Sequence, residues 1–180
     1  LKVLPQQFAQ ERELLDRFHR EARALAKLKH PGIVPVYDEG FEGGIHYFAM
    51  EYLEGETLAH MIAKKGRLAS HEIVPLVEQV AGALDHIHAN GLVHRDVKSS
   101  NIIINRQGVP VLMDFGVAHQ ASNEALTAKG MIHGTPELMS PEQAAGKEVD
   151  GRTDFYSLGV VVYQALTGQF PHKGETPLMT

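Results

Sequence analysis

The segment "GLVHRDVKSSNIII" (residues 91–104) places three chemically different polar side chains within six positions, with apolar residues on both sides. Asp96 can accept a proton from a hydroxyl group or orient it, and Lys98 can place a positive charge on an oxyanion. Asn101 offers an amide oxygen, which is a good ligand for a hard cation such as Mg²⁺. By itself, the segment is more readily interpreted as a polar turn in which Asp and Asn side chains cap backbone amides.

A carboxylate further along the chain strengthens the chemical interpretation. Asp114 follows a predicted short strand and stands directly before Phe115 and Gly116, a context that suits a movable metal ligand. Phosphoryl transfer needs a metal ion that holds the phosphates, a cation for the transferred group and a residue that positions the nucleophile. Together with the polar side chains of residues 96–101, Asp114 supplies all of these, so the sequence predicts a phosphoryl-transfer site.

Composition excludes several other classes of protein. The chain has 180 residues, of which 43% are hydrophobic, and its 22 acidic against 17 basic residues give a formal charge of −5. We therefore expect no nucleic-acid binding, which needs clustered cations. The absence of cysteine excludes disulfides and thiolate chemistry. The longest apolar stretch, residues 157–166, is too short to span a bilayer. We expect no membrane contact within this segment and a cytoplasmic location.

Apolar periodicity divides the chain into a strand-rich opening and a mainly helical remainder, as in an α+β fold. In the opening we expect the end of a strand at residues 2–5, a helix over residues 10–29, and strands over residues 33–40 and 45–53. In the remainder we expect helices over residues 58–64, 70–90 and 153–167, with Thr57 and Ser70 as amino-terminal caps, and short strands over residues 92–93, 102–104 and 111–113. The boundary is expected near Leu53.

Three motifs in this order resemble a known family. "HRDVKSSN", "DFG" and "GTPELMSPE" resemble the catalytic loop, the metal-binding loop and the end of the activation segment of eukaryotic-type (Hanks-type) serine/threonine protein kinases. The wording of residues 18–38 and 152–171 is similar to the bacterial branch of that family. The resemblance implies a two-lobed kinase fold truncated at both ends, with a partial N-lobe at 1–52 and a partial C-lobe at 53–180.

The expected truncation has a consequence for activity. The first residue is Leu and no G-x-G-x-x-G motif, which in the family covers the phosphates, occurs in the sequence. We therefore expect the chain to be an internal piece of a longer protein, and the fragment alone to be inactive.

The resemblance also assigns roles to the four polar residues of the predicted site. It implies that Asp96 is the catalytic base and that Lys98 contacts the γ-phosphate of ATP. Asn101 and Asp114 are implied to be the ligands of Mg²⁺, for which Mn²⁺ is an alternative. The lysine at position 98 favours Ser/Thr over Tyr specificity, because tyrosine kinases of the family have a different loop sequence.

On the nucleotide side, Lys2 stands where the family has the strand lysine that contacts the α- and β-phosphates, and Glu21 matches the helix glutamate that pairs with it. The alternative for Glu21 is an ordinary solvated helix charge. The adenine-binding residues implied by the resemblance are Met50 as gatekeeper, Glu51 to Leu53 as hinge, and Ile103 beneath the ring.

The activation segment carries the predicted regulatory residues. Kinases with an arginine before the catalytic aspartate, here Arg95, usually need a negative charge that offsets it, and a phosphothreonine supplies that charge. Thr127 matches the autophosphorylated threonine of the bacterial relatives best, with Ser122 and Thr135 as further candidates. Thr135 also matches a threonine beside the substrate, although it is equally a turn residue ahead of a proline. Lys129 occupies a position where a second threonine is common.

Other residues of the motifs are expected to be structural. His94 and Phe115 are expected to stack with Leu25 and Val36 in an internal apolar column, which makes His94 a core residue and not an acid or base. Asp154 resembles the buried helix carboxylate that accepts backbone amides of the catalytic loop, and a buried carboxylate needs such partners.

The expected partners are ATP, proteins that present Ser or Thr, and the chain itself through autophosphorylation. The main alternative is a pseudokinase that acts as an ATP-binding scaffold or regulatory module. A kinase-like enzyme for small molecules is a second alternative, against which the peptide-docking segment "GTPELMSPE" argues. Retention of the four polar residues and of Lys2 favours the active protein kinase.

Overall fold

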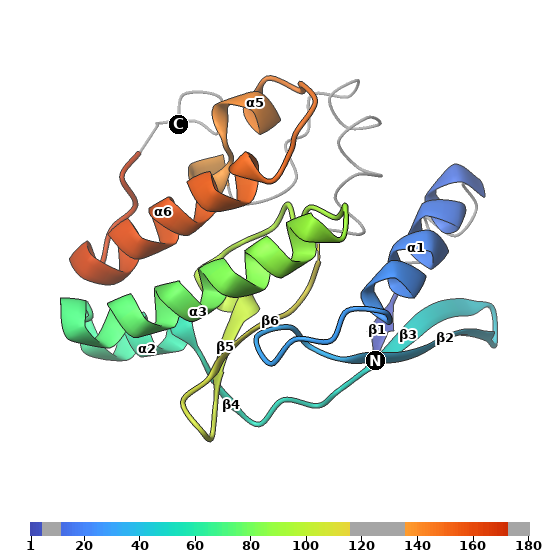
Figure 1. Cartoon of the computed structure of the whole chain (residues 1–180), viewed down its shortest axis with the longest axis horizontal. Helices are drawn as coiled ribbons and strands as arrows, with labels where there is room; N and C mark the ends of the chain where they lie inside the picture. The colour runs from blue at the N-terminus through green and yellow to red at the C-terminus, as the bar shows by residue number, and fades with distance from the viewer. Residues whose placement is uncertain (5–11, 116–135, 173–180) are drawn as a thin grey trace.

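The computed structural model of the chain describes residues 1–4, 12–115 and 136–172 (Figure 1). The first part comprises β1 (Lys2–Val3), α1 (Arg12–Leu25), β2 (Val36–Glu42) and β3 (Ile45–Met50). The second part comprises β4 (Gly55–Thr57), α2 (Leu58–Lys65), α3 (Ser70–Ala89), η1 (Ser99–Asn101), β5 (Ile102–Asn105), β6 (Pro110–Leu112), η2 (Pro136–Leu138), α5 (Pro141–Ala144) and α6 (Arg152–Thr167). Among these described residues, no helix is both long and apolar enough to cross a bilayer.

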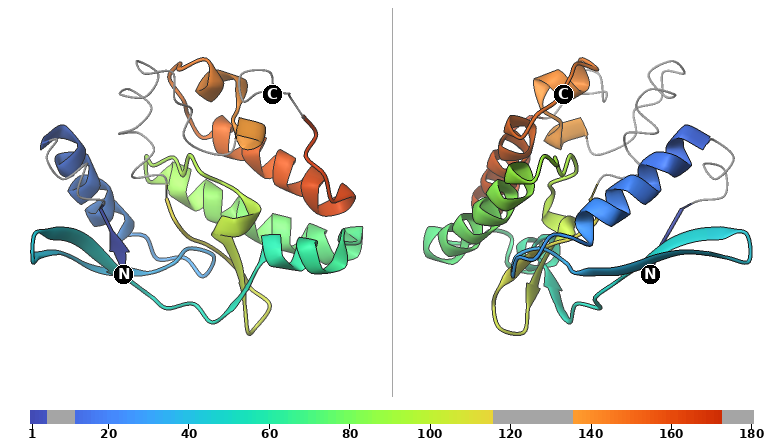
Figure 2. Two further views of the ribbon diagram at one scale, coloured as in Figure 1. Left: turned by 180° about the vertical axis from the view of Figure 1, so that it is seen from behind. Right: turned by 45° about the vertical axis from the view of Figure 1, so that its right-hand side comes forward.

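The first part is an antiparallel sheet of order β1-β3-β2 with α1 on one of its faces (Figures 1 and 2). The predicted helix and strands are confirmed. The apolar stripe of α1 buries Phe18, Ala22 and Leu25. The Phe18 ring lies 5.2 Å from the Phe48 ring of β3, centroid to centroid. The helix ends at Leu25, whereas the prediction placed its end at residue 29.

Polar contacts also attach α1 to the sheet. Glu39 of β2 accepts hydrogen bonds from His19 Nδ1 and Arg23 Nε of α1, each at 2.6 Å. Burial alone would raise the pKa of Glu39, but the hydrogen bonds from His19 and Arg23 outweigh it and lower that pKa. One carboxylate on the sheet thus holds two successive turns of the helix.

In the second part, the three predicted helices are confirmed as α2, α3 and α6, and α6 lies along α3 in both views of Figure 2. Thr57 caps α2 as predicted, since its Oγ1 accepts the His60 N–H at 3.1 Å. The prediction that Ser70 caps α3 is wrong. Ala69 is the cap residue, and its N–H donates to the Glu72 carboxylate at 2.9 Å, so the first turn of α3 is closed without a capping hydroxyl.

The segment that leads into residues 94–101 differs from the prediction. The expected strand at residues 92–93 is wrong, because the Leu92 N–H bonds back to the Ile87 carbonyl at 3.2 Å and so continues the carboxyl-terminal turn of α3. The two later strands are confirmed as the hairpin β5–β6, with Ile102 opposite Leu112. The segment is therefore anchored by a helix on one side and a sheet on the other.

A short bridge joins the two parts. Ile33 and Leu112 form a parallel β-bridge, in which Val34 N–H donates to the Leu112 carbonyl and Leu112 N–H donates to the Gly32 carbonyl, both at 2.9 Å. The chain crosses a second time at residues 51–54, between β3 and β4 (Figure 1). The predicted boundary after residue 52 falls in this crossing, and the division itself stays a prediction.

Asp154 of α6 is fully buried and holds the start of the polar segment. Its carboxylate accepts the N–H of His94 at 2.8 Å and the N–H of Arg95 at 2.7 Å, and its Oδ2 lies 2.7 Å from His88 Nε2. The predicted role of Asp154 is therefore confirmed. A buried carboxylate is stable only with such donors, and the donors in turn depend on it.

His94 is buried beneath the same segment. Its ring packs against Phe115, with the ring centroids 4.5 Å apart and the ring planes tilted by 34°, so the predicted contact is confirmed. Leu25 and Val36 are buried in the core that includes Phe115. A carbonyl can only accept, so Nε2 donates to Met113 O at 3.2 Å, and Nδ1 accepts the Asp96 N–H at 3.3 Å. Only the neutral ring satisfies both bonds, and burial lowers the pKa of His94.

We predict that Asp154→Ala lowers the free energy of unfolding by about 3 kcal/mol or more. The substitution removes two hydrogen bonds to a charged acceptor, each worth about 1.5–3 kcal/mol, and strands two buried N–H groups. Chemical denaturation of the purified protein measures the change. Glu78→Ala removes an exposed carboxylate from α3 and serves as the control. An Asp154→Ala protein as stable as the control would contradict this account.

We also predict that His94 makes the protein less stable in acid. The pKa of His94 is lowered in the folded protein, so below about pH 6.5 the unfolded chain binds a proton that the folded chain does not bind. Stability is then lost as the pH falls from 6.5, by at most about 1.4 kcal/mol per pH unit for one proton. His94→Phe should show a shallower dependence of unfolding free energy on pH between 7.5 and 5.5. Parallel curves for the two proteins would rule the explanation out.

Candidate active site

The backbone turns sharply at Arg95. Its φ is +65°, in the left-handed region. This conformation costs a residue with a side chain about 1–3 kcal/mol and persists only where the surrounding structure imposes it. The surroundings do so here. The Arg95 N–H donates to Asp154 of α6, and its carbonyl accepts a hydrogen bond from Gln143 of α5 at 3.1 Å. The turn sets the direction in which the next residue, Asp96, leaves the backbone.

The three polar side chains of residues 96–101 meet at one point. Asp96 Oδ2 lies 2.8 Å from Lys98 Nζ and accepts a hydrogen bond from Asn101 Nδ2 at 2.9 Å. Asn101 Nδ2 also donates to the Asp96 carbonyl at 2.9 Å. All three side chains are largely or fully buried, at 15% exposure for Asp96 and 23% for Lys98. Partial burial strengthens their mutual attraction, so the cluster holds one arrangement.

Asp114 follows the next strand, and the residue before it bonds to the backbone of Asn101. The N–H of Met113 donates to the Asn101 carbonyl at 2.9 Å, which fixes the end of β6 against η1. Asp114 itself has a φ of +56°, a second left-handed residue in the site. Its side chain is 39% exposed, so it is the most accessible of the four predicted catalytic residues. One left-handed residue, Arg95, directly precedes the carboxylate of Asp96, and the other, Asp114, carries the second carboxylate itself.

Lys2 reaches the site from β1. Its Nζ lies 3.3 Å from Asp114 Oδ1 and donates to the Phe115 carbonyl at 3.0 Å. The sequence predicts Glu21 as its partner. Glu21 belongs to α1, but its side chain is outside the described part of the structure, so that pair stays a prediction. The structure thus brings the predicted phosphate-binding lysine next to the predicted metal ligand.

The oxygen atoms of the site suit a hard divalent cation. Both hydrogen bonds donated by Asn101 Nδ2 go to Asp96, which leaves Oδ1 of Asn101 as the atom for a metal ion, and the Asp114 carboxylate would be the second ligand. In the described residues, no group of three or more His, Asp or Glu side chains could hold a metal by itself. Mg²⁺ is commonly bound by one or two protein oxygens together with substrate phosphates, so these two residues fit it.

The residues predicted to face the adenine lie around the crossing between the two parts. Met50 ends β3 and is half-buried against the core, and the Glu51 N–H donates to the Pro35 carbonyl at 2.9 Å. Leu53 is half-buried, whereas Glu51 is exposed. Ile103 of β5 is half-buried and faces Thr57 of β4 in register.

Close approach of β4 to β5 depends on Gly55. A Cβ atom at this position would lie 2.2 Å from the Ile104 carbonyl oxygen, so any side chain would push the two strands apart. The same Cβ would lie 2.9 Å from the side chain of Ile103. Gly55 thereby sets the separation between the crossing and the predicted floor of the adenine site.

Two predicted regulatory residues, Thr127 and Thr135, lie outside the described residues, as does Ser122. Sequence reasoning also missed two glutamines that touch the loop. Gln164 of α6 accepts a hydrogen bond from the buried Ser99 hydroxyl at 2.9 Å, and Gln143 contacts Arg95 as described above. The wording Ser-Pro-Glu-Gln at residues 140–143 is a capping-box signature that could have located α5, but it does not reveal the contact with the loop.

Comparison with known proteins agrees with this geometry. The family described as "Protein kinase domain" matches residues 1–179. The serine/threonine-protein kinase PrkC of Bacillus subtilis is 40% identical over 176 residues, which cover 98% of this chain and 27% of that protein. The serine/threonine-protein kinase PknL of Mycobacterium tuberculosis is 40% identical over 178 residues, or 99% of this chain and 45% of that protein.

A solved structure shows the same fold. The kinase domain of PknI from Mycobacterium tuberculosis superposes with a TM-score of 0.77 at 32% identity, over 97% of this chain and 65% of that one. The chain therefore spans less than half the length of these two curated relatives, and somewhat less than two thirds of that solved kinase domain. The chain belongs to the protein kinase domain family, in the branch of the bacterial serine/threonine-protein kinases.

Proposed function

We propose that the protein that carries this chain transfers the γ-phosphate of ATP to Ser or Thr residues of protein substrates. The observation that carries the proposal is the convergence of Lys98 and Asn101 on Asp96, each within hydrogen-bonding distance of its carboxylate. Asp114 follows the neighbouring strand, next to Met113, whose N–H donates to the Asn101 carbonyl. This set contains every kind of group that phosphoryl transfer requires of the protein, and kinases among the relatives support the reaction class.

The residues then divide the work as follows. Asp96 orients the hydroxyl group of the substrate and accepts its proton, while Lys98, beside it, offers positive charge to the transferred group. Asn101 and Asp114 would hold Mg²⁺, which neutralises phosphate charge when bound. Lys2 would bind the α- and β-phosphates, with Glu21 as its partner on α1.

The adenine and the protein substrate occupy different sides of this cluster in the proposal. Met50, the hinge from Glu51 to Leu53, and Ile103 would bind the adenine. The segment that follows residue 135 would dock the peptide, and the chain itself is a candidate substrate through autophosphorylation. We place this activity in the cytoplasm, where ATP is available.

We predict that Asp96→Asn lowers phosphate transfer to a Ser/Thr peptide at least about 100-fold, the usual contribution of a positioned base, and leaves ATP binding nearly unchanged. Asp114→Ala should abolish transfer as well, but by weakening the Mg²⁺-dependent part of ATP binding. Radiolabelled transfer and calorimetric titration of ATP, with and without Mg²⁺, separate the two effects in the purified full-length protein.

Asp85→Asn makes the same chemical change at an exposed position of α3 and should leave both quantities at the wild-type level. Equal transfer by wild type, Asp96→Asn and Asp114→Ala would reject the kinase assignment. Binding of ATP without transfer in the wild-type protein would instead support the pseudokinase alternative.

We further propose that a phosphate on Thr127 or Thr135 activates the protein by offsetting the charge of Arg95. Thr127→Ala should then lower the activity of protein that has been incubated with Mg²⁺ and ATP several-fold, while leaving protein treated with phosphatase unaffected. Mass spectrometry of the incubated protein locates the phosphate. Wild-type protein with the same activity before and after phosphatase treatment would argue against this regulation.

A further inference from the structure

In the described part of the chain, a side chain of the segment after residue 135 bonds directly to the catalytic loop. Gln143 of α5 donates from Nε2 to the Arg95 carbonyl at 3.1 Å, and its Oε1 accepts the Ser140 N–H at 3.0 Å. The chemistry of the two partners fixes the amide orientation, because a carbonyl can only accept and an N–H can only donate. Gln143 is therefore a bridge with a donor end on the loop and an acceptor end on its own segment.

The donor end acts on the peptide group that precedes Asp96. The carbonyl of that peptide belongs to Arg95 and is bound by Gln143, while its N–H belongs to Asp96 and is bound by His94 Nδ1 at 3.3 Å. Both ends of the peptide plane are thus held by side chains. Loss of the bond to Gln143 would remove one restraint on this plane, whose rotation changes ψ of Arg95 and φ of Asp96. Rotation of the plane would change the direction of the Asp96 side chain.

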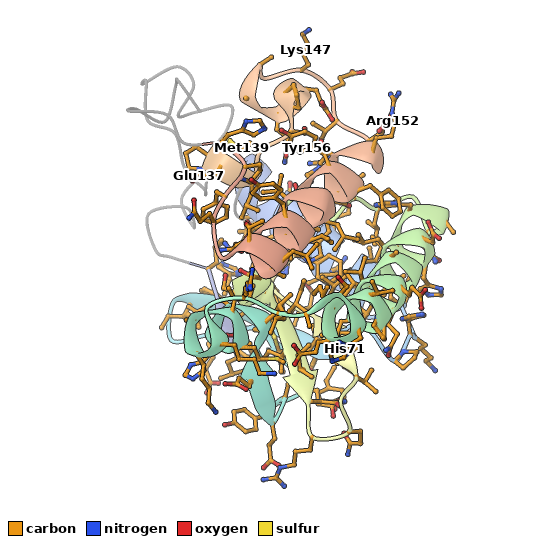
Figure 3. All side chains as sticks on the ribbon, turned by 90° about the vertical axis from the view of Figure 1, so that its left-hand side faces the viewer. His71, Glu137, Met139, Lys147, Arg152 and Tyr156 are labelled. Carbon is orange, nitrogen blue, oxygen red and sulfur yellow. The ribbon has the colours of Figure 1, made fainter. Side chains whose placement is uncertain are left out.

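The acceptor end is tied to a segment that is docked on α6. Figure 3 shows η2 and α5 against the amino-terminal half of α6, with Met139 and Tyr156 on that side. Ser157 Oγ donates to the Leu138 carbonyl at 2.8 Å, and the buried hydroxyl groups of Ser140 and Thr153 lie 2.6 Å apart. In the sequence, the segment that begins at Pro136 directly follows the residues that include Thr127 and Thr135, and Gln143 connects this segment to the loop.

We propose that Gln143 is a positioning residue for Asp96, which makes the orientation of the catalytic carboxylate depend on the docking of residues 136–145. This inference rests on the proposed kinase function and specifies how its site is controlled. Asp154 holds the N–H groups of the loop from α6, and Gln143 holds the carbonyl from α5. Only the second contact comes from the segment that continues from the predicted regulatory residues.

The alternative is that Gln143 merely closes α5. It is the third residue of a capping box, in which its side chain accepts the N–H of Ser140 and Ser140 Oγ accepts the N–H of Gln143. Glutamate serves this purpose as well as glutamine does. Glutamate has no N–H for the Arg95 carbonyl, however, and brings a carboxylate next to it. Gln143→Glu therefore keeps the cap and removes the bridge, whereas Gln143→Ala removes both.

The test measures kcat and KM for a Ser/Thr peptide and for ATP in the purified full-length protein. We expect Gln143→Glu to lower kcat about tenfold or more, as small misplacements of a catalytic group do, with KM for ATP within about twofold of wild type. Gln79→Glu is the matched control, because Gln79 also donates to a backbone carbonyl, that of Pro75, but on the exposed face of α3. Its kcat should equal that of the wild type.

Hydrogen–deuterium exchange of peptides that cover residues 92–98 gives a readout independent of turnover. We expect faster exchange in Gln143→Glu and Gln143→Ala than in wild type and Gln79→Glu. A Gln143→Glu protein with wild-type kcat and wild-type exchange would overturn the inference and leave Gln143 as a cap. Absence of transfer in the wild type would reject the kinase function, and exchange would still decide whether Gln143 holds the loop.

Discussion

The site depends on one buried carboxylate. Asp154 accepts the N–H groups of His94 and Arg95 from within the core, and without these bonds the left-handed turn at Arg95 has no reason to form. This acceptor satisfies both amides, and the carboxylate tolerates burial because of such donors. The arrangement is therefore cooperative, and the direction of Asp96 follows from packing between α6 and the loop.

Charges within the site are arranged in opposite pairs. Lys98 lies beside Asp96 and Lys2 beside Asp114, so each half-buried cation has a carboxylate within 3.3 Å or less. Such pairing reduces the cost of keeping charged groups partly away from water. In the function proposed here, a triphosphate and a metal ion would take over these same charges.

The sequence predicted the elements with strong periodicity and the cluster of residues 96–101. Helix α1 and the helices that begin near residues 58, 70 and 152 were predictable because their apolar stripes or caps are local features. The strand at residues 92–93 was wrong, because two apolar residues after a helix do not reveal that Leu92 bonds back to Ile87. Likewise the cap at Ser70 was wrong, since Glu72 satisfies the start of α3. The bridge from Gln143 to Arg95 joins residues distant in sequence, and no local pattern encodes it.

The bridge between Ile33 and Leu112 constrains how the two parts can move. Backbone hydrogen bonds from Val34 and to Gly32 keep Leu112 at a fixed separation from the loop that follows α1. A displacement of the first sheet relative to α3 and α6 would therefore be a rotation about this bridge as a hinge, or fulcrum, and not a translation along it. Points near the fulcrum, such as the end of β6, would hardly shift. The tip of the β2–β3 hairpin, at Gly43, would sweep the widest arc.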